Sequence, residues 1–448
     1  MSDARANAAG ERSMRRVALT ALAGTSIEWF DFFLYGTAAA LVFPTLFFAE
    51  DMPPLVSLMA SFSTFAVGFL ARPVGGVVFG HFGDRVGRKK ALVTALLLMG
   101  SATTLIGLLP GYAAIGWLAP LLLMLLRFAQ GLAVGGQWGG AMLLVTEHAP
   151  PHRRGFYGAF AQAGAPVGLI LANLAFLVVS ASMPADAFQA WGWRVPFLLS
   201  VLLIGLSMYV QLKLEDTPAF RDLQARAPTV RLSAEETLKI AAARQSPVLE
   251  VLVTYPREIV LAAGAFLAVQ VTFYILITFV IAYGSNPVGL GLPRPTMLAA
   301  VLISSVAQIP AVFLASIYSD RRGRRGVYML GAALLGLWAF AIFPLIDTGS
   351  FLLITLALCV GQLLVGMMYG PQAALLAELF STHVRYSGAS LGYQLGAILG
   401  GALSPMVATA LLAWFDSTLG IAVYIAVACT LTLISVALLS ETHRRSLH

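Results

Sequence analysis

Twelve long apolar stretches, separated by short polar segments, dominate this chain. A helix that spans a bilayer needs about 20 mostly apolar residues, and its backbone must satisfy its own hydrogen bonds there. The stretches have that length and lie at 17–48, 56–79, 91–110, 116–145, 155–180, 193–212, 258–284, 296–318, 326–346, 351–377, 386–413 and 418–440. The sequence therefore predicts an all-α integral membrane protein with twelve transmembrane helices.

The composition agrees with this class of protein. The chain is 59% hydrophobic and 11% charged, whereas a soluble domain carries roughly 25% charged residues. The net charge is +7, but the basic residues are spread over short loops, so we expect contact with membrane lipid and not with nucleic acid. Cys359 and Cys429 lie inside apolar stretches and are expected to be buried thiols. The polar segment 1–16 runs into an apolar stretch that is too long for a signal-peptide core, so we expect it to be retained.

A short charged motif occurs twice, each time between two apolar stretches. Asp84 and Arg85 are followed by Gly87 and Arg88, and Asp320 and Arg321 by Gly323 and Arg324. A second pair of matches, at nearly the same offset, places Glu147 before Arg154 and Glu378 before Arg385. Two repeated features at one offset indicate an internal duplication, which in a membrane chain suggests a secondary transporter. We expect two pseudo-symmetric six-helix halves, 1–212 and 258–448, joined by a connector at 213–257.

The basic residues predict the orientation of the helices. Of the 28 Lys and Arg residues, all but four precede the first stretch, follow the last, or lie in a polar segment that follows an even-numbered stretch (the second, fourth, sixth, eighth or tenth). The exceptions are Arg72, Arg127, Arg194 and Arg294. The positive-inside rule then places both termini and the connector in the cytoplasm. The pattern Ser233-x-x-Glu236 predicts a capped, short amphipathic helix in the connector, lying near anionic headgroups.

We interpret the duplicated loops as a closure latch between the two halves. The glycines permit tight turns, and Asp84 is placed to cap the helix that follows it. The alternative is an ordinary basic cytoplasmic loop, but the repetition of the full spacing favours the latch. The predicted latch residues are Gly83, Asp84, Arg85, Gly87, Arg88, Asp320, Arg321, Arg324, Glu147, Arg154, Glu378 and Arg385.

Charged residues inside the apolar stretches are the next signal, because they are expensive in a bilayer and usually functional. Glu28 and Asp31 are three residues apart on one helix face, with Tyr35 a turn further on. Glu28 lies roughly 16 Å from one membrane surface and Arg127 roughly 14 Å from the other, so their depths coincide. We expect Arg127 to pair with the two acids. An acid that loses this arginine to a substrate binds a proton more readily, which would couple transport to protons. The alternative is a static structural ion pair.

Other polar residues in the stretches could contact a substrate. The second half is nearly free of intramembrane charge and offers amides and phenols, each of which could instead form an interhelical hydrogen bond. Arg72, next to Pro73, suits a functional and a structural role equally. The predicted substrate-binding residues are Arg127, Gln130, Gln137, Trp138, Tyr35, Gln270, Tyr274 and Tyr369. Glycines at four-residue spacing predict close helix packing, at Gly131, Gly135 and Gly139 and at Gly388, Gly392, Gly396 and Gly400.

Enzyme signatures are absent from the sequence. It contains no zinc-protease motif, no phosphate-binding loop and no cluster of aspartates for a metal-diphosphate site. Glu147, His148 and His152 resemble metal ligands in type only, because they flank a proline-rich turn. We therefore expect no metal, no cofactor other than the coupling proton, and no enzyme activity. A membrane enzyme acting on lipids remains the alternative from another class.

Several longer motifs resemble a known family. The twelve stretches and the 80–90 loop resemble the major facilitator superfamily. More narrowly, the segments IEWFDFFLYG (27–36), ARPVGG (71–76), RFAQGLAVGGQWGG (127–140), WGWRVPF (191–197) and VRYSGASLGYQ (384–394) are similar to the metabolite:proton symporter family. That family includes bacterial carriers of shikimate, 2-oxoglutarate, citrate, and proline or betaine. The resemblance implies alternating access and proton coupling in a bacterial inner membrane. Gln137 stands where the family usually has Glu. A glutamine cannot carry a proton, so Glu28 and Asp31 become the stronger candidates for proton coupling.

The sequence thus predicts a monomeric proton-coupled symporter that imports a small polar organic solute, most consistent with a carboxylate. In this interpretation Arg127 meets the carboxylate, and Gln270, Tyr274 or Tyr369 contacts neutral groups. A zwitterion or betaine symporter is the alternative substrate class, which would rely on the acids and on cation–π contact with Trp138. An exporter or a uniporter of the same fold is the alternative mechanism.

Overall fold

A computed structural model describes residues 2–86, 88–135, 145–146, 149–215, 253–286, 289–380 and 385–441. Within these ranges the chain is helical, with no strand. The first part contains α1 (Ser2–Leu41), α2 (Phe43–Leu46), α3 (Pro54–Val86), α4 (Arg88–Leu108), α5 (Tyr112–Ile115), α6 (Leu118–Gly135), η1 (Pro151–Arg153), α8 (Arg154–Ser182), α9 (Ala185–Ala187), η2 (Phe188–Gly192) and α10 (Arg194–Glu215). The second part contains α14 (Pro256–Tyr274), η3 (Ile275–Phe279), α15 (Val280–Ser285), α16 (Arg294–Arg322), α17 (Arg324–Ile346), α18 (Phe351–Leu379), α19 (Arg385–Gly396), η4 (Ala397–Ala402), α20 (Ser404–Phe415) and α21 (Leu419–Leu438).

Each of the predicted apolar stretches contains described helix, although the one at 116–145 is described as helix only as far as Gly135 and again at 145. The stretch at 258–284 is a continuous rod of α14, the π-helical turn η3 and α15, and the stretch at 386–413 is built in the same way from α19, η4 and α20. By length and apolarity, 10 described helices can cross a membrane, or 11 if the bent pair around Trp193 counts as one span; α4 holds a shorter apolar helix, Val93–Leu108. The arrangement is the predicted fold of twelve transmembrane helices.

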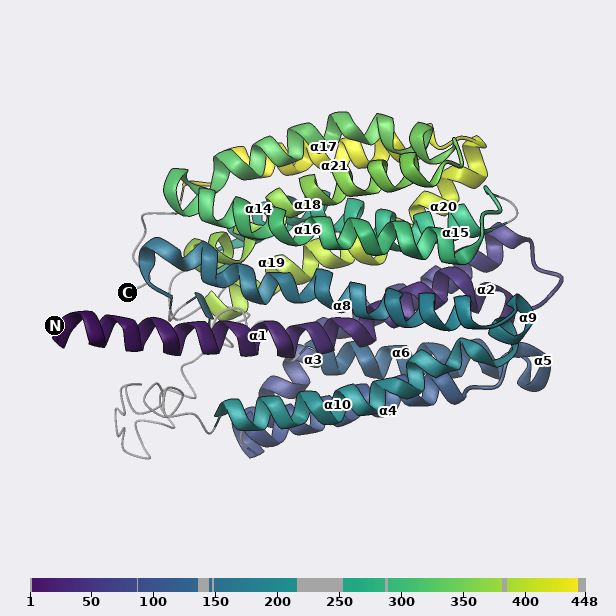
Figure 1. Ribbon diagram of the computed structural model, residues 1–448, viewed down its shortest axis with the longest axis horizontal. Coiled ribbons are helices and arrows are strands. Elements are labelled where there is room, and N and C mark those ends of the chain that lie inside the picture. Colours follow the sequence, from purple (N-terminus) through teal and green to yellow (C-terminus); the bar gives the residue numbers. More distant parts are fainter. Residues whose placement is uncertain are drawn as a thin grey trace.

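The helices run side by side along the long axis of the molecule (Figure 1). In this view α3, α4, α6 and α10 lie on one side, and α14, α16, α17, α18 and α21 lie on the other. Helices α1 and α8 pack against each other between the two groups, and α8 also packs along α16. Helix α3 also packs against η4 and α20, so the interface between the groups involves α1, α3 and α8.

Several of the glycines at four-residue spacing bring pairs of helices close together, as predicted, while Gly139 lies outside the described residues. A methyl group added at Gly131 or Gly135 of α6 would overlap the backbone carbonyl of Gly68 or Arg72 in α3. In the second half, Gly392 and Gly396 lie against Ala262 and Phe266 of α14. Close packing of this kind is how helices associate without a hydrophobic driving force between them. It fixes the position of α3 against α6, and hence of the arginines that they carry.

The first duplicated loop differs from its prediction in one respect. Helix α3 continues through Gly83, Asp84 and Arg85 to Val86, and α4 begins at Arg88. Asp84 therefore lies in the last turn of α3, and Gly83 lies in helix and not in a turn. In the second copy, Gly323 makes the break between α16 and α17 with a φ of 104°, which a residue with a side chain rarely adopts. The predicted amphipathic helix at Ser233–Glu236 lies outside the described residues.

Candidate functional site

Two buried arginines lie at the interface between the helix groups. Arg72 of α3 is 1% exposed and Arg127 of α6 is 0% exposed. The two guanidinium groups share one aromatic ring, because their Cζ atoms lie 4.3 Å and 4.2 Å from the centre of Phe32. Arg127 also lies 4.2 Å from the ring centre of Tyr35, and Arg72 lies 4.5 Å from that of Phe69. Aromatic faces stabilise these cations in the absence of water.

Arg127 bonds to an amide and not to an acid. Its Nη1 donates a 3.0 Å hydrogen bond to Gln130, whose amide nitrogen donates a 2.7 Å bond to Thr103 of α4. Its Nε and Nη2 are buried without any hydrogen-bond partner. Gln130 is thus an orienting residue for Arg127 in this conformation.

The expected ion pair between Arg127 and the acids of α1 is not formed, which corrects the sequence interpretation. Asp31 is 1% exposed, and neither of its carboxylate oxygens has a hydrogen-bond partner. Glu28 is only partly buried and lines a different part of the site from Arg127. The reason lies in the helical register of α1. Phe32 and Tyr35 project toward Arg127, whereas Asp31 is about 100° around the helix from Phe32.

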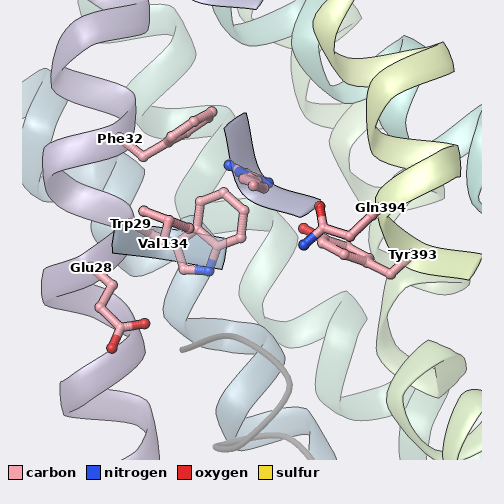
Figure 2. Close-up of a pocket in the computed structure, with 7 residues that line it drawn as sticks. Glu28, Trp29, Phe32, Val134, Tyr393 and Gln394 are labelled. Atoms are coloured by element: carbon pink, nitrogen blue, oxygen red, sulfur yellow. The ribbon is translucent and has the colours of Figure 1, made fainter. Parts of the chain in front are cut away.

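A pocket adjoins Arg72. It is lined by Glu28, Trp29, Phe32, Arg72, Val134, Tyr393 and Gln394. Figure 2 shows Trp29 and Phe32 of α1 on one side and Tyr393 and Gln394 of α19 on the other, so both helix groups contribute. The Nε and Nη2 atoms of Arg72 are buried and have no hydrogen-bond partner. Arg72 interacts electrostatically with the phenol groups of Tyr274 and Tyr393.

A second pocket lies next to the first, because Trp29 and Tyr393 line both. Its polar lining comes from the second half, from Gln270, Tyr274, Gln308, Tyr369 and Tyr393. Both amide atoms of Gln308 are buried without a partner. Three of the predicted substrate-binding residues, namely Gln270, Tyr274 and Tyr369, therefore lie together.

The other predicted residues are placed as follows. The hydroxyl of Tyr35 donates a 2.7 Å hydrogen bond to Thr64, so it is occupied within the first half. Gln137 and Trp138 lie outside the described residues. Arg72 had no single assigned role. Tyr393 and Gln308 were among the amides and phenols of the second half that could contact a substrate, but they were not selected as substrate-binding residues, and Phe32 was not predicted. The Arg-Pro pair in α3 and the aromatic residues that surround Asp31 are sequence signals that point to this arrangement.

The second duplicated loop joins the two halves. Asp320, at the end of α16, accepts a 2.8 Å hydrogen bond from the backbone N–H of Gly155 and a 2.9 Å bond from that of Phe156, at the start of α8. A carboxylate at a helix N-terminus satisfies unpaired N–H groups and the helix dipole. Asp320 also pairs with Arg324 at 2.6 Å, and Arg324 pairs with Glu378 of α18 at 3.0 Å.

The other predicted latch residues are placed as follows. Arg321 is exposed, while Arg154 is the first residue of α8 and is 3% exposed. Arg88 and Arg385 begin α4 and α19. Gly87 and Glu147 lie outside the described residues. Among the side chains that the structure describes, Asp320 makes a contact between the halves, and Arg324 and Glu378 support it.

Comparison with known proteins identifies the family. Residues 22–393 match the sequence model of the Major Facilitator Superfamily. The chain belongs to this superfamily. Its members move small molecules across membranes, so the protein is a transporter and not an enzyme, and such a transporter needs no cofactor. In the described residues no group of His, Cys, Asp or Glu is arranged to hold a metal ion.

Relatives in this superfamily match over nearly the whole chain. The inner membrane metabolite transport protein YhjE of Escherichia coli K12 is 43% identical over 97% of this chain and 96% of its own length. The shikimate transporter of the same strain is 36% identical over 96% of this chain and 95% of its own length. The proline/betaine transporter of E. coli K12 is 31% identical over 97% of this chain and 85% of its own length. The protein is therefore a metabolite transporter of the superfamily and a bacterial multi-pass membrane protein.

The fold is also that of a solved transporter. The xylose transporter XylE of E. coli, in a partially occluded inward-open conformation, superposes with a TM-score of 0.72. The match covers 97% of this chain and 99% of XylE at 16% sequence identity, so it supports the fold alone.

Proposed function

We propose that this transporter imports a small polar organic carboxylate together with protons. The observation that carries the proposal is the pair Arg72 and Arg127. Both are buried beside the interface, and neither guanidinium bonds to a carboxylate among the described residues. Two buried positive charges without an acid partner favour an anion as the missing partner.

The proposed site extends across both halves. Arg72 and Arg127 supply positive charge from the first half, while Gln270, Tyr274 and Tyr369 supply neutral hydrogen-bonding groups from the second. A solute with one acidic end and one polar, uncharged end matches this distribution. The similarity to a shikimate transporter supports a carboxylate, and that to a proline/betaine transporter supports a zwitterion as the second candidate.

Asp31 is the proposed proton carrier. It is a buried acid without a hydrogen-bond partner, in the helix that also supplies Phe32 to the two arginines. Such a carboxyl group is more stable in its neutral form, and a nearby arginine that became available would favour its charged form. Glu28, at the pocket, is the second candidate. Gln137 cannot titrate, which leaves the two acids of α1.

The proposed transport cycle is alternating access between the halves 1–212 and 258–448, which the connector 213–257 joins on the cytoplasmic side. The bonds from Asp320 to α8 hold the two halves together at the end predicted to be cytoplasmic. They must break when the site opens to the cytoplasm.

Right-side-out membrane vesicles test this proposal. Uptake of a carboxylate should require a proton gradient and should stop when an uncoupler is added. Uptake that is unchanged by the uncoupler would indicate a uniporter. Proton-driven uptake of betaine without any uptake of carboxylates would favour the zwitterion alternative.

A further inference from the structure

The guanidinium of Arg72 has an unsatisfied edge at the pocket. Its Nε and Nη2 atoms lie on the same side of the planar group, and both are buried without a partner. Two parallel N–H groups of this kind match the two oxygens of a carboxylate. Leaving them unpaired and away from water is unfavourable, because each group loses its hydration without gaining a hydrogen bond. A ligand carboxylate that filled the position would remove this cost.

Arg127 is a poorer candidate for direct contact with a ligand. Its guanidinium is covered by Phe32, Tyr35 and Phe65, at 4.2, 4.2 and 4.9 Å from their ring centres, and its Nη1 is bonded to Gln130. A methyl group added at Gly68 would lie only 2.5 Å from its Nε. Arg72 lines the first pocket, whereas Arg127 lines neither of the two pockets. Arg72 also lies over aromatic rings, so the difference between the two arginines is that only Arg72 reaches a pocket.

In the neighbouring second pocket, Gln308 presents a neutral amide. Its oxygen and nitrogen are both buried and unbonded, and its neighbours in the lining include Val269, Phe273 and Val365. A glutamine amide can accept two hydrogen bonds and donate two, so it suits a hydroxyl or a carbonyl group. A charged group placed here would be desolvated without a counter-charge, which is strongly unfavourable.

We propose that Arg72 anchors the substrate carboxylate through its Nε and Nη2 edge and that Gln308 contacts a neutral polar group at the far end of the same molecule. The site then selects hydroxylated or keto monocarboxylates over dicarboxylates and betaines. Trp29 and Tyr393, which line both pockets, form the walls between the two ends. The assignment rests on the proposed import of carboxylates and adds the contact atoms and the substrate class.

Calorimetry on the full-length protein in lipid nanodiscs tests the assignment. The probes are 3-hydroxycyclohexanecarboxylate, cyclohexanecarboxylate, cyclohexane-1,3-dicarboxylate and glycine betaine. The wild type should bind the hydroxylated monocarboxylate most tightly and the dicarboxylate at least about tenfold more weakly, because its second charge has no partner. This comparison needs no variant. Equal binding of the dicarboxylate would overturn the proposal.

Two pairs of variants then test the two contacts. Arg72→Lys keeps the charge but loses the pair of parallel N–H groups that can bind a carboxylate in a bidentate way, so affinity for monocarboxylates should fall about tenfold. Arg127→Lys should lose less affinity. Gln308→Leu should weaken binding of the hydroxylated probe but not of cyclohexanecarboxylate. Gln362→Leu is the matched control, because Gln362 is also a buried, unbonded amide but lines neither pocket. A larger loss in Arg127→Lys, or an equal loss of both probes in Gln308→Leu, would overturn the assignment.

The outcomes separate this inference from the proposed function. If the wild type binds the hydroxylated carboxylate and Arg72→Lys binds it equally well, the assignment fails while carboxylate import stands. If the wild type binds betaine and no carboxylate, both fail.

Discussion

Asp320 accepts a 2.8 Å hydrogen bond from the backbone N–H of Gly155, although the two residues are 165 positions apart in the chain. The bond joins the end of α16 to the start of α8 and therefore joins the two halves. Asp320 is held for this contact by Arg324, which is itself paired with Glu378. The second copy of the duplicated motif thus contains Asp320, whose hydrogen-bond partner, Gly155, belongs to the first half.

The first prediction concerns this contact. Asp320→Asn keeps the size of the side chain but removes its charge, so it should weaken the cap on α8 by about 1 kcal/mol and shift the transporter away from the closed cytoplasmic side. Transport should fall while the amount of protein in the membrane stays near normal. Cysteine labelling at the cytoplasmic end should increase. The exposed Asp186, changed to Asn, serves as the control. Wild-type transport in Asp320→Asn would argue against a latch, and the duplication predicts a similar loss for Asp84→Asn.

The second prediction concerns proton coupling. Asp31→Asn should abolish accumulation of substrate against a gradient, because an amide cannot carry the proton. Exchange of labelled for unlabelled substrate should survive, since exchange does not require proton release. Glu28→Gln, which alters a partly buried acid at the pocket, is the comparison. Full proton-driven accumulation in both variants would remove both acids from the proton path.

The third prediction concerns Phe32, whose ring faces both arginines. Phe32→Leu removes two cation–π contacts as well as aromatic packing. The contacts should contribute about 1–2 kcal/mol beyond the packing loss. Phe176→Leu measures the packing loss alone, because the rings recorded against buried Phe176 are those of Phe188 and Phe197. Thermal unfolding in detergent should show a clearly lower transition temperature for Phe32→Leu than for Phe176→Leu. Equal shifts would mean that the ring does not stabilise the arginines.

The fourth prediction concerns the close contact of α3 and α6. Gly135→Ala places a methyl group onto the carbonyl of Arg72, so the helices must separate, at a cost of about 1–3 kcal/mol. Because Arg72 would move with α3, substrate affinity should fall together with stability. Gly205→Ala is the control, since nothing lies within 4 Å of its added methyl group. That variant should be neutral or slightly stabilised. A fully stable, active Gly135→Ala protein would show that the contact is not required.

The fifth prediction concerns topology. The distribution of basic residues places both termini and the connector in the cytoplasm. A reporter that is active only in the cytoplasm should be active when it is fused after Leu447. A reporter that is active only outside the cytoplasm should be inactive at the same position. A cysteine introduced at Arg231 should react with a membrane-permeant reagent and resist an impermeant one added to whole cells. Labelling by the impermeant reagent would reverse the orientation.

The sequence alone determined the helices and the superfamily, because a bilayer tolerates only long apolar helices and because the loop motifs are distinctive. It also identified Arg127, Gln270, Tyr274 and Tyr369 as buried polar groups, since polar residues in apolar stretches are conspicuous. The tertiary structure decided which of them meet. Residue spacing places Asp31 near the depth of Arg127 but cannot say that Phe32 and Tyr35 fill the space between the helices. Nor can it show that Asp320 reaches α8 and not the helix that follows it. Both outcomes depend on rotations of helices against one another, which are set by the packing of glycine and aromatic side chains far apart in the chain.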